Sequence, residues 1–258
     1  GEDYVHTAHE AMRTYDHDAL MIYKGEPGVV VLPDSTEDVR QVMTICHEAG
    51  VPVIARGAGT CLSGGATPAP GGVLLVTTRM NRILEVDYEN MLARVQPGVV
   101  NLHLSNETRP NGFHYAPDPS SQMACTIGGN AAENSGGAHC LKYGMTTNHI
   151  MGMTVVLSSG EVVELGADGE EVPGFDLRGF FVGSEGTFAL TTEITVRLVP
   201  NPEGVRTMLT TFSNVGDACR TVSDIIAAGA VPAAMELMDR YTVEAIEKVM
   251  KAGYPQDA

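Results

Sequence analysis

Residues 117–137, PDPSSQMACTIGGNAAENSGG, constrain the fold more than any other part of this sequence. The stretch is dense in Gly, Ser, Ala and Asn, and its only charged residues are Asp118 and Glu133. A flexible linker is similarly small and polar, but Ile127 stands where a linker carries a solvated residue. Glycine lets main chain come within hydrogen-bonding distance of a ligand because no Cβ intervenes, and Ser and Asn offer the neutral donors that a phosphate or ribose requires. We therefore expect this backbone to lie against a bound molecule.

A second glycine-rich stretch, RGAGTCLSGG, occupies residues 56–65 and directly follows the apolar run 51–55. A strand that ends in Gly, Ser and Thr exposes successive backbone N–H groups, which form a concave site for an anion. Arg56 is the only cation in the two stretches together. Two nearly neutral segments about sixty residues apart indicate one large ligand that carries a diphosphate. The alternative is that both stretches are tight turns without a ligand.

The commoner nucleotide-binding motifs do not fit these glycines. A P-loop ends in Gly-Lys-Ser or Gly-Lys-Thr, and no Lys follows any of them. The dinucleotide fingerprint G-x-G-x-x-G opens a helix in a βαβ unit, but Leu62 stands where its third glycine belongs. The sequence therefore disfavours a Rossmann fold.

The charge balance limits the class of partner. The 258 residues include 32 acidic and 16 basic side chains, so the formal charge is −16 and neither nucleic acid nor an anionic membrane surface is an expected partner. No apolar run approaches the length of a membrane span. The five cysteines lack C-x-x-C spacing, which argues against a disulfide framework or a zinc site and favours a reducing compartment. His6 and His9 share a helix face but have no third ligand, so we expect no metal.

Apolar periodicity predicts an α+β fold. The expected strands are 29–32, 51–55, 73–78, 83–87, 93–96, 151–157, 161–165 and 191–198, and the expected helices are 6–17, one between Ser35 and Gly50, 100–107 and 176–181. From residue 205 the sequence pattern changes. It predicts a strand at 205–212, a helix from 214 or 215 to 228, a strand at 235–238 and a helix at 243–251. We expect a different domain to begin there.

Four segments together resemble one known family. They are VIARGAGTCLSGG at 53–65, APDPSSQMACTIGGNAAENSGG at 116–137, LKYG at 141–144 and GSEGT at 183–187. Their order and content are similar to the FAD-linked oxidases of the vanillyl-alcohol-oxidase (PCMH-type) superfamily. The resemblance is strongest to the flavin subunit of bacterial glycolate oxidase and to D-lactate dehydrogenases, and it covers nearly the whole chain.

The resemblance implies a two-lobed FAD-binding domain followed by a substrate cap of ferredoxin-like α+β architecture. The expected division is an N-terminal helical segment at 1–27, a first lobe at 28–79, a second lobe at 80–203 and the start of the cap at 204–258. Further motifs of the family's cap have no counterpart in these residues. We therefore expect a chain truncated within the cap.

The resemblance also assigns a cofactor site. Backbone N–H groups of the first loop should bind the diphosphate, residues 117–118 should border the isoalloxazine ring or the ribityl chain, and residues 125–130 and 134–136 should run along ring and phosphates. Tyr143 should pack on the cofactor, and the GSEGT turn with Ile194 should contact the adenosine half. The expected cofactor-binding residues are Arg56, Gly57, Ala58, Gly59, Thr60, Cys61, Ser63, Gly64, Gly65, Pro117, Asp118, Cys125, Thr126, Gly128, Gly129, Asn130, Asn134, Ser135, Gly136, Tyr143, Gly144, Glu185, Gly186 and Ile194.

By resemblance, the expected function is oxidation of a small 2-hydroxy acid, of the glycolate or D-lactate type, to the 2-oxo acid by hydride transfer to FAD. Electrons would then pass to a carrier or to a partner such as an iron–sulfur subunit. The alternative is a noncatalytic FAD-binding or electron-transfer module of a multisubunit complex. A non-redox flavin enzyme and a cell-wall precursor reductase fit the motifs less well. The expected location is the cytoplasm. The alternative is peripheral attachment to the inner membrane through a partner.

The catalytic groups stay unassigned, because in this family the base and the carboxylate-binding groups come mainly from the cap. His139 and Tyr143 are the nearest candidates, although a loop role and cofactor packing explain them more simply. Family members with covalent flavin carry a His in the first loop, and its absence here predicts noncovalent FAD, with a thioether to Cys61 or Cys125 as the alternative. Related sequences often carry Gly at position 61, where a positive φ would strain a cysteine by about 1–2 kcal/mol.

Overall fold

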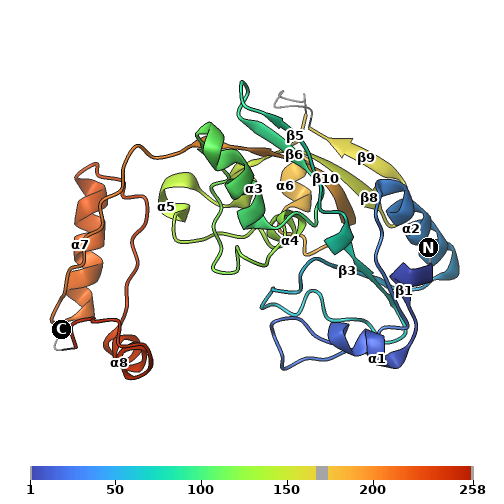
Figure 1. The fold of residues 1–258 in the computed structure, drawn as a ribbon, viewed down its shortest axis with the longest axis horizontal. Helices are drawn as coiled ribbons and strands as arrows, with labels where there is room; N and C mark the ends of the chain where they lie inside the picture. The colour runs from blue at the N-terminus through green and yellow to red at the C-terminus, as the bar shows by residue number, and fades with distance from the viewer. Residues whose placement is uncertain (1, 167–173, 257–258) are drawn as a thin grey trace. The chain divides into compact units, whose positions relative to one another are not determined.

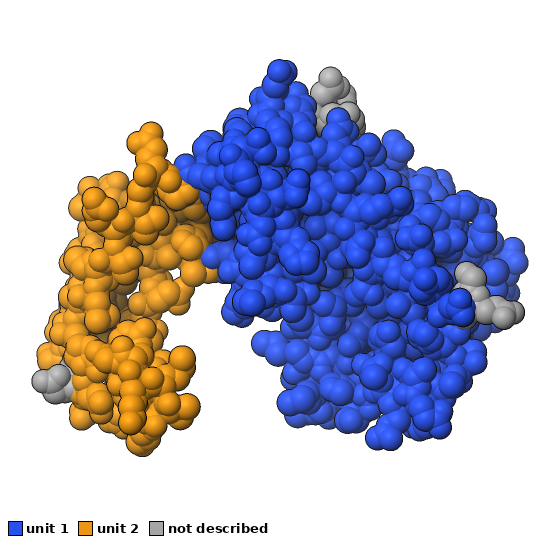
Figure 2. Space-filling view, viewed as in Figure 1, with its two compact units in different colours: residues 1–137, 145–201 blue, residues 138–144, 202–258 orange. Residues whose placement is uncertain are grey.

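The computed structural model describes residues 2–166 and 174–256, and the chain divides into two compact units. One unit contains residues 1–137 and 145–201, and the other contains residues 138–144 and 202–258, as the two colours of Figure 2 show. All the strands found among the described residues belong to the first unit. That unit therefore holds the architecture that positions a site.

A four-stranded sheet with the order β1-β2-β4-β3 forms the N-terminal part of the first unit (Figure 1). Three of its strands, β2 (Val29–Val31), β4 (Val73–Val76) and β3 (Val53–Arg56), run parallel, and β1 (Val5–His6) pairs antiparallel with β2. The central strand β4 is buried along its whole length, as expected for a parallel strand covered on both faces. β3 delivers the chain directly into the glycine-rich loop 56–65.

Helix α2 (Thr36–Ala49) begins and ends where the sequence predicts. Ser35 caps it, because its Oγ accepts the N–H of Asp38 at 3.1 Å, and Gly50 ends it with φ +66°. The buried face of the helix packs between residues of both sheets. The shared cluster consists of Val39, Met43, Leu75, Met80, Val156 and Leu190. α2 therefore ties the two sheets of the unit together.

The second sheet is five-stranded and antiparallel, with the order β5-β6-β10-β8-β9. Its members are β5 (Ile83–Asp87), β6 (Leu92–Val95), β10 (Ala189–Arg197), β8 (Ile150–Leu157) and β9 (Val162–Leu165). The two predicted hairpins are confirmed, and Gly160 in the second turn has φ +86°. One face of the sheet packs on α3 (Asn101–Thr108) and α4 (Ile127–Glu133), and together they build the largest core cluster.

The remaining elements of the first unit are short. They are η1 (Glu2–Tyr4), α1 (His9–Met12), η2 (Arg13–Tyr15), η3 (Thr77–Arg79), η4 (Arg109–Asn111), β7 (Phe113–His114), η5 (Thr146–Asn148), α6 (Arg178–Phe181) and β11 (Val199–Pro200). The single helix predicted at 6–17 is wrong, since α1 covers four residues and a 3₁₀ turn follows it. None of the α1 residues is buried, so no apolar face holds a longer helix in place.

The second unit contains α5 (Cys140–Tyr143), α7 (Val215–Ala227) and α8 (Arg240–Val249). The strands predicted at 205–212 and 235–238 are wrong, because these residues have no ladder partner among the described residues. An apolar segment becomes a strand only where another strand takes up its backbone hydrogen bonds. The predicted α+β class is confirmed, whereas the domain boundaries and the ferredoxin-like cap stay predictions.

Candidate functional site

A cavity of about 500 Å³ lies where the end of β3, helix α4 and the start of β10 meet. Its walls come from three parts of the chain, within residues 55–66, 120–135 and 181–191, and Thr77 and Pro97 complete them. Gly, Ala, Ser and Thr make up most of the lining. A volume of this size is typical of a small-molecule site, and small side chains leave the backbone accessible to the ligand.

The first loop presents a run of backbone N–H groups that no protein atom accepts. In the described parts of the chain, none of the N–H groups from Ala58 to Gly65 donates a hydrogen bond. Gly59 and Gly64 have φ values of +73° and +80° among neighbours of negative φ, and such alternation turns successive N–H groups toward a common side. Backbone donors require an acceptor from water or a ligand. The loop therefore fits an anion.

Two other glycines permit close packing at the walls of the cavity. A Cβ on Gly57 would lie 2.5 Å from Thr126 Oγ1, and a Cβ on Gly128 would lie 2.5 Å from the Cβ of Pro97. The Gly128 N–H donates to the Pro97 carbonyl at 2.8 Å, and Thr126 Oγ1 accepts the N–H of Gly129 at 3.2 Å as the N-cap of α4. The packing of the protein itself therefore requires glycine at 57 and 128.

Asn130 supplies a buried polar group whose one partner among the described side chains is the weakly bonding Cys125 thiol. Its side chain is 1% exposed and lines the cavity, and neither amide atom has an oxygen or nitrogen partner among the described residues. The Cys125 thiol lies beside it, and burial raises the pKa of that thiol. An unsatisfied buried amide costs about 1–3 kcal/mol, so a ligand that pairs with it gains affinity.

Two carboxylates, Glu133 at the end of α4 and Glu185 in the GSEGT turn, also line the cavity. Burial raises the pKa of Glu133, the hydrogen bond from Ser63 Oγ at 3.0 Å lowers it, and the neighbouring Glu185 and Asp18 raise it again. A group with this environment is closer to its neutral form than an exposed glutamate.

The GSEGT turn is fixed to the end of α4. The N–H groups of Gly183 and Glu185 donate to the carbonyls of Ala131 and Ala132 at 2.8 and 2.9 Å, in the last turn of the helix. Glu185 has φ +53°, a left-handed conformation that is unfavourable for a residue with a Cβ. These two hydrogen bonds hold the turn at the cavity wall.

Arg56 is the only Lys or Arg among the described lining residues, and its guanidinium is engaged by the protein. Nη1 donates to the His17 carbonyl at 2.7 Å, and the group lies 5.7 Å from the centroid of the Tyr15 ring. Burial lowers the pKa of Arg56, and the nearby Asp18 opposes that shift. Backbone N–H groups are thus the main anion donors of the site.

Comparison with known proteins decides the family. A family model described as FAD binding domain matches residues 27–166, more than half of the chain. The chain belongs to this FAD-binding family. A second model, for the C-terminal domain of FAD linked oxidases, matches residues 201–258. The predicted family resemblance and the predicted cofactor, FAD, are therefore confirmed.

Curated relatives and solved structures agree with this assignment. Glycolate oxidase subunit GlcD of Escherichia coli K12 is 48% identical over 100% of this chain and 52% of its own length, and GlcD of Bacillus subtilis is 45% identical over 95% and 52%. D-lactate dehydrogenase of Anaerostipes hadrus is 38% identical over 96% and 53%. The chain spans about half the length of these curated relatives.

Two solved structures share the fold. An alkyldihydroxyacetonephosphate synthase superimposes with a TM-score of 0.78 at 24% identity, over 90% of this chain and 44% of that one. The 4-ethylphenol oxidase of Gulosibacter chungangensis superimposes with a TM-score of 0.69 at 29% identity, over 79% and 41%. The fold is thus common to proteins with different names.

The structure of this FAD-binding chain brings most of the predicted site residues to one cavity. Those that line it are Arg56, Gly57, Ala58, Gly59, Thr60, Cys61, Ser63, Gly65, Cys125, Thr126, Gly128, Gly129, Asn130, Ser135, Glu185 and Gly186. They come from segments that are far apart in the sequence, so their convergence is a property of the fold. Their individual contacts with FAD stay predictions.

The other predicted residues lie outside the lining. They are Gly64, Pro117, Asp118, Asn134, Gly136, Tyr143, Gly144 and Ile194. The Ile194 side chain is fully buried in the core of the five-stranded sheet, and Asn134 uses its Oδ1 to accept the N–H of Thr147 at 2.9 Å. Tyr143 and Gly144 belong to the second unit, as does His139.

Sequence reasoning missed several residues of the lining. The missed residues are Ala55, Leu62, Ala66, Thr77, Pro97, Ser120, Ser121, Ala132, Glu133, Phe181, Ser184, Ala189, Leu190 and Thr191. Ser120, Ser121 and Glu133 lie within residues 117–137, so the composition of that stretch could have identified them. The start of β10 gave no such signal, because its apolar residues are typical of any buried strand.

The cysteine and metal predictions can be placed on the structure. Cys61 is not among the described residues of positive φ, so the strain considered for it does not arise. Within residues 2–166 and 174–256, no three His, Cys, Asp or Glu side chains are grouped so that they could hold a metal ion. Over the same residues, none of the helices has the length and apolar content needed to span a bilayer.

Proposed function

We propose that this chain is the FAD-binding portion of a flavin-dependent oxidoreductase that acts on a small 2-hydroxy acid. The observation that supports it best is the run of N–H groups from Ala58 to Gly65 without protein acceptors, on the wall of a 500 Å³ cavity. A diphosphate provides the acceptors that these donors need. The buried amide of Asn130, which has no oxygen or nitrogen partner among the described residues, lines the same cavity and would pair with another polar atom of the cofactor.

The residues of this chain hold and orient the cofactor. The first loop would bind the diphosphate through its backbone, and the Thr60 and Ser63 hydroxyls would assist. Small residues at 128–129 would let the cofactor lie close to α4. When bound, FAD supplies a two-electron acceptor for the hydride of the substrate α-carbon. We assign no catalytic base within these residues.

The substrate class rests on the relatives. Proteins named glycolate oxidase subunit and D-lactate dehydrogenase are 38–48% identical to this chain over nearly its whole length. We propose glycolate or D-lactate as the substrate of the whole protein, and a carrier or an iron–sulfur partner subunit as its electron acceptor. We further propose a cytoplasmic location, with attachment to the inner membrane only through such a partner.

We propose that FAD is held noncovalently. Burial raises the pKa of Cys61 to about 11 and also raises that of Cys125, so neither thiol is a ready thiolate nucleophile near neutral pH. The first loop contains no histidine. The residues that line the cavity therefore favour neither a flavin bond to histidine nor a thioether to cysteine.

A visible absorption spectrum of the purified chain tests the cofactor proposal. We expect a flavin band after incubation with FAD, and we expect acid precipitation to release it into the supernatant. A band that stays with the pellet would refute noncovalent binding, and no band with excess FAD would refute the site in this chain. Anaerobic addition of glycolate or D-lactate to the whole protein then tests the activity, since bleaching supports an oxidoreductase and a stable band supports the noncatalytic module.

A further inference from the structure

Residues 15–25, here called the N-terminal strap, lie against the first loop although they precede the matched FAD-binding region at 27–166. The strap meets the loop at two polar points. Its His17 carbonyl accepts from Arg56, and its Asp18 carboxylate accepts from Cys61. Gly64 of the loop also lies close to the strap, because a Cβ there would be 3.5 Å from Leu20 Cδ2.

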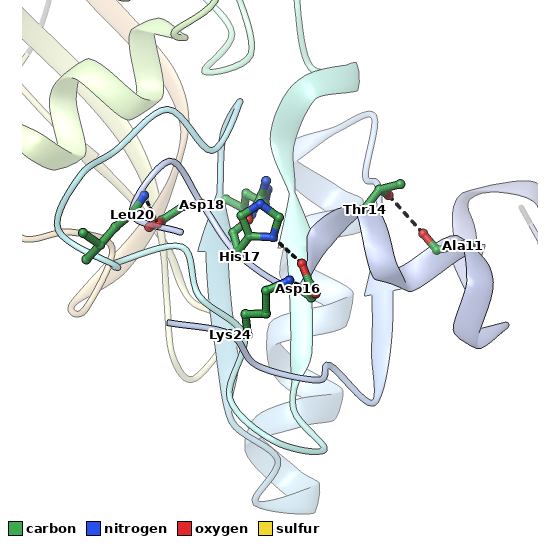
Figure 3. Close-up of polar contacts among 8 residues, drawn as sticks. Ala11, Thr14, Asp16, His17, Asp18, Leu20 and Lys24 are labelled. Atoms are coloured by element: carbon green, nitrogen blue, oxygen red, sulfur yellow. Dashed lines mark hydrogen bonds and ion pairs between the residues drawn. The ribbon is translucent and has the colours of Figure 1, made fainter. Parts of the chain in front are cut away.

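Asp18 is the central residue of the strap. Its side chain is 3% exposed, Oδ1 accepts the Leu20 N–H at 2.8 Å, and Oδ2 accepts the Cys61 thiol at 2.9 Å. Figure 3 shows the bond between Asp18 and Leu20, and the separate pair formed by His17 and Asp16. A buried carboxylate persists only where hydrogen bonds and a nearby positive charge compensate its lost hydration. Arg56 is that positive charge.

Arg56 connects the strap to the tip of the loop. A Cβ on Gly59 would overlap the Arg56 guanidinium, so the two residues are in close packing contact. The same guanidinium donates to His17 and lies over the Tyr15 ring. The loop is thus fixed at residue 56 and again at residue 61, and both attachments end on the strap.

We propose that Asp18 is a positioning residue for FAD, which holds the first loop with the N–H groups of residues 58–65 available to the diphosphate. This inference rests on the proposed FAD site and adds to it a part of the chain outside the family match. Preorganisation is the physical reason, because a loop that is already ordered loses less conformational entropy when the ligand binds. Asp18 itself does not line the cavity.

The first test compares FAD affinity in Asp18→Asn with that in Asp16→Asn. Asp16 is a matched control on the same strap, since its carboxylate pairs with His17 and Lys24 and acts on the loop only through a weaker charge effect on Arg56 than that of Asp18. We expect the FAD dissociation constant to rise at least tenfold in Asp18→Asn and to change less than twofold in the control. Equal affinity of Asp18→Asn and the unmodified chain would overturn the proposal.

The second test uses the Cys61 thiol in the absence of FAD. The rate of alkylation by iodoacetamide at Cys61 is followed by peptide mass mapping as a function of pH. Burial raises the pKa of Cys61, Asp18 raises it further, and Glu133 of α4 adds a smaller effect in the same direction. We expect the pH midpoint to fall in Asp18→Asn. An unchanged pH midpoint, with alkylation of Cys61 faster by the same factor at every pH, would mean that the substitution loosens the chain in general. That result would contradict the positioning role.

The two proposals can fail separately. If the unmodified chain binds no FAD, the proposed function fails, and the alkylation profile still decides whether Asp18 controls the loop. If Asp18→Asn does not fold, Cys61→Ser and Cys61→Ala replace it, because only Ser retains a donor for Asp18. We expect Cys61→Ala to bind FAD at least threefold more weakly than Cys61→Ser, and equal affinities would overturn the proposal.

Discussion

Gly128→Ala tests whether glycine at this position is required by packing or by the ligand. The added Cβ would lie 2.5 Å from the Pro97 Cβ, 2.9 Å from its carbonyl oxygen and 3.1 Å from its Cα. Two of these atoms are backbone, and the Gly128 N–H is already bonded to that carbonyl at 2.8 Å. The clash therefore cannot be relieved by rotating one side chain.

Overpacking of this kind costs about 1–3 kcal/mol, and contact with backbone favours the upper part of that range. Alanine in a helix returns up to about 1 kcal/mol relative to glycine. We therefore expect Gly128→Ala to lower the free energy of unfolding by about 2 kcal/mol. Urea denaturation of the FAD-free chain, followed by circular dichroism, measures it.

Gly129→Ala is the matched control on the same helix. Its Cβ would meet only Thr126 Oγ1, at 3.3 Å, so a shift of a few tenths of an ångström accommodates it. We expect the free energy of unfolding to stay within about 1 kcal/mol of the original, and FAD affinity to fall because the new methyl group enters the cavity. If Gly128→Ala proves as stable as Gly129→Ala, the packing explanation is refuted.

Three further predictions concern single residues. Ser35→Ala should lower the free energy of unfolding by about 1 kcal/mol, read from the urea midpoint, because α2 loses its N-cap acceptor for Asp38; an unchanged midpoint would contradict this. Asn130→Leu should leave the FAD-free chain at least as stable, since it removes a buried amide without an oxygen or nitrogen partner, while FAD binding measured by flavin fluorescence weakens; a large loss of stability would show that the amide has a strong protein partner. The raised pKa of Glu133 means that the folded chain binds a proton that the unfolded chain releases, so stability falls as pH rises above the unfolded value of 4.5. Glu133→Gln should reduce that fall in thermal melts from pH 4 to 7, and an identical slope would refute it.

The sequence predicted the elements that have local signals. Ser35 and Gly50 mark the ends of α2, and the polar turns mark both hairpins of the five-stranded sheet. The two glycine-rich stretches were predicted to share one ligand because both are nearly neutral and rich in the small residues that suit a diphosphate. Local chemistry was sufficient for these features.

Other features depend on contacts that no local pattern encodes. The apolar segment 205–212 resembles a strand in composition, but strand formation depends on a pairing partner and none exists in the described residues. The bond between Cys61 and Asp18 joins residues 43 positions apart, and that between Arg56 and His17 joins residues 39 apart. Neither pairing could be derived without the fold.

The glycines of the two stretches have different physical roles, although the sequence suggested one role for all of them. Gly57 lets the first loop pack on Thr126 of the second stretch, and Gly128 lets α4 pack on Pro97, as their forbidden Cβ positions indicate. Gly59 instead accommodates the Arg56 guanidinium, and its positive φ helps to orient the neighbouring N–H groups. The cavity therefore depends on glycine twice, because close packing of the loops creates its walls and left-handed backbone supplies its donors. Substitutions of the first kind should lower stability, and substitutions of the second kind should lower FAD affinity as well.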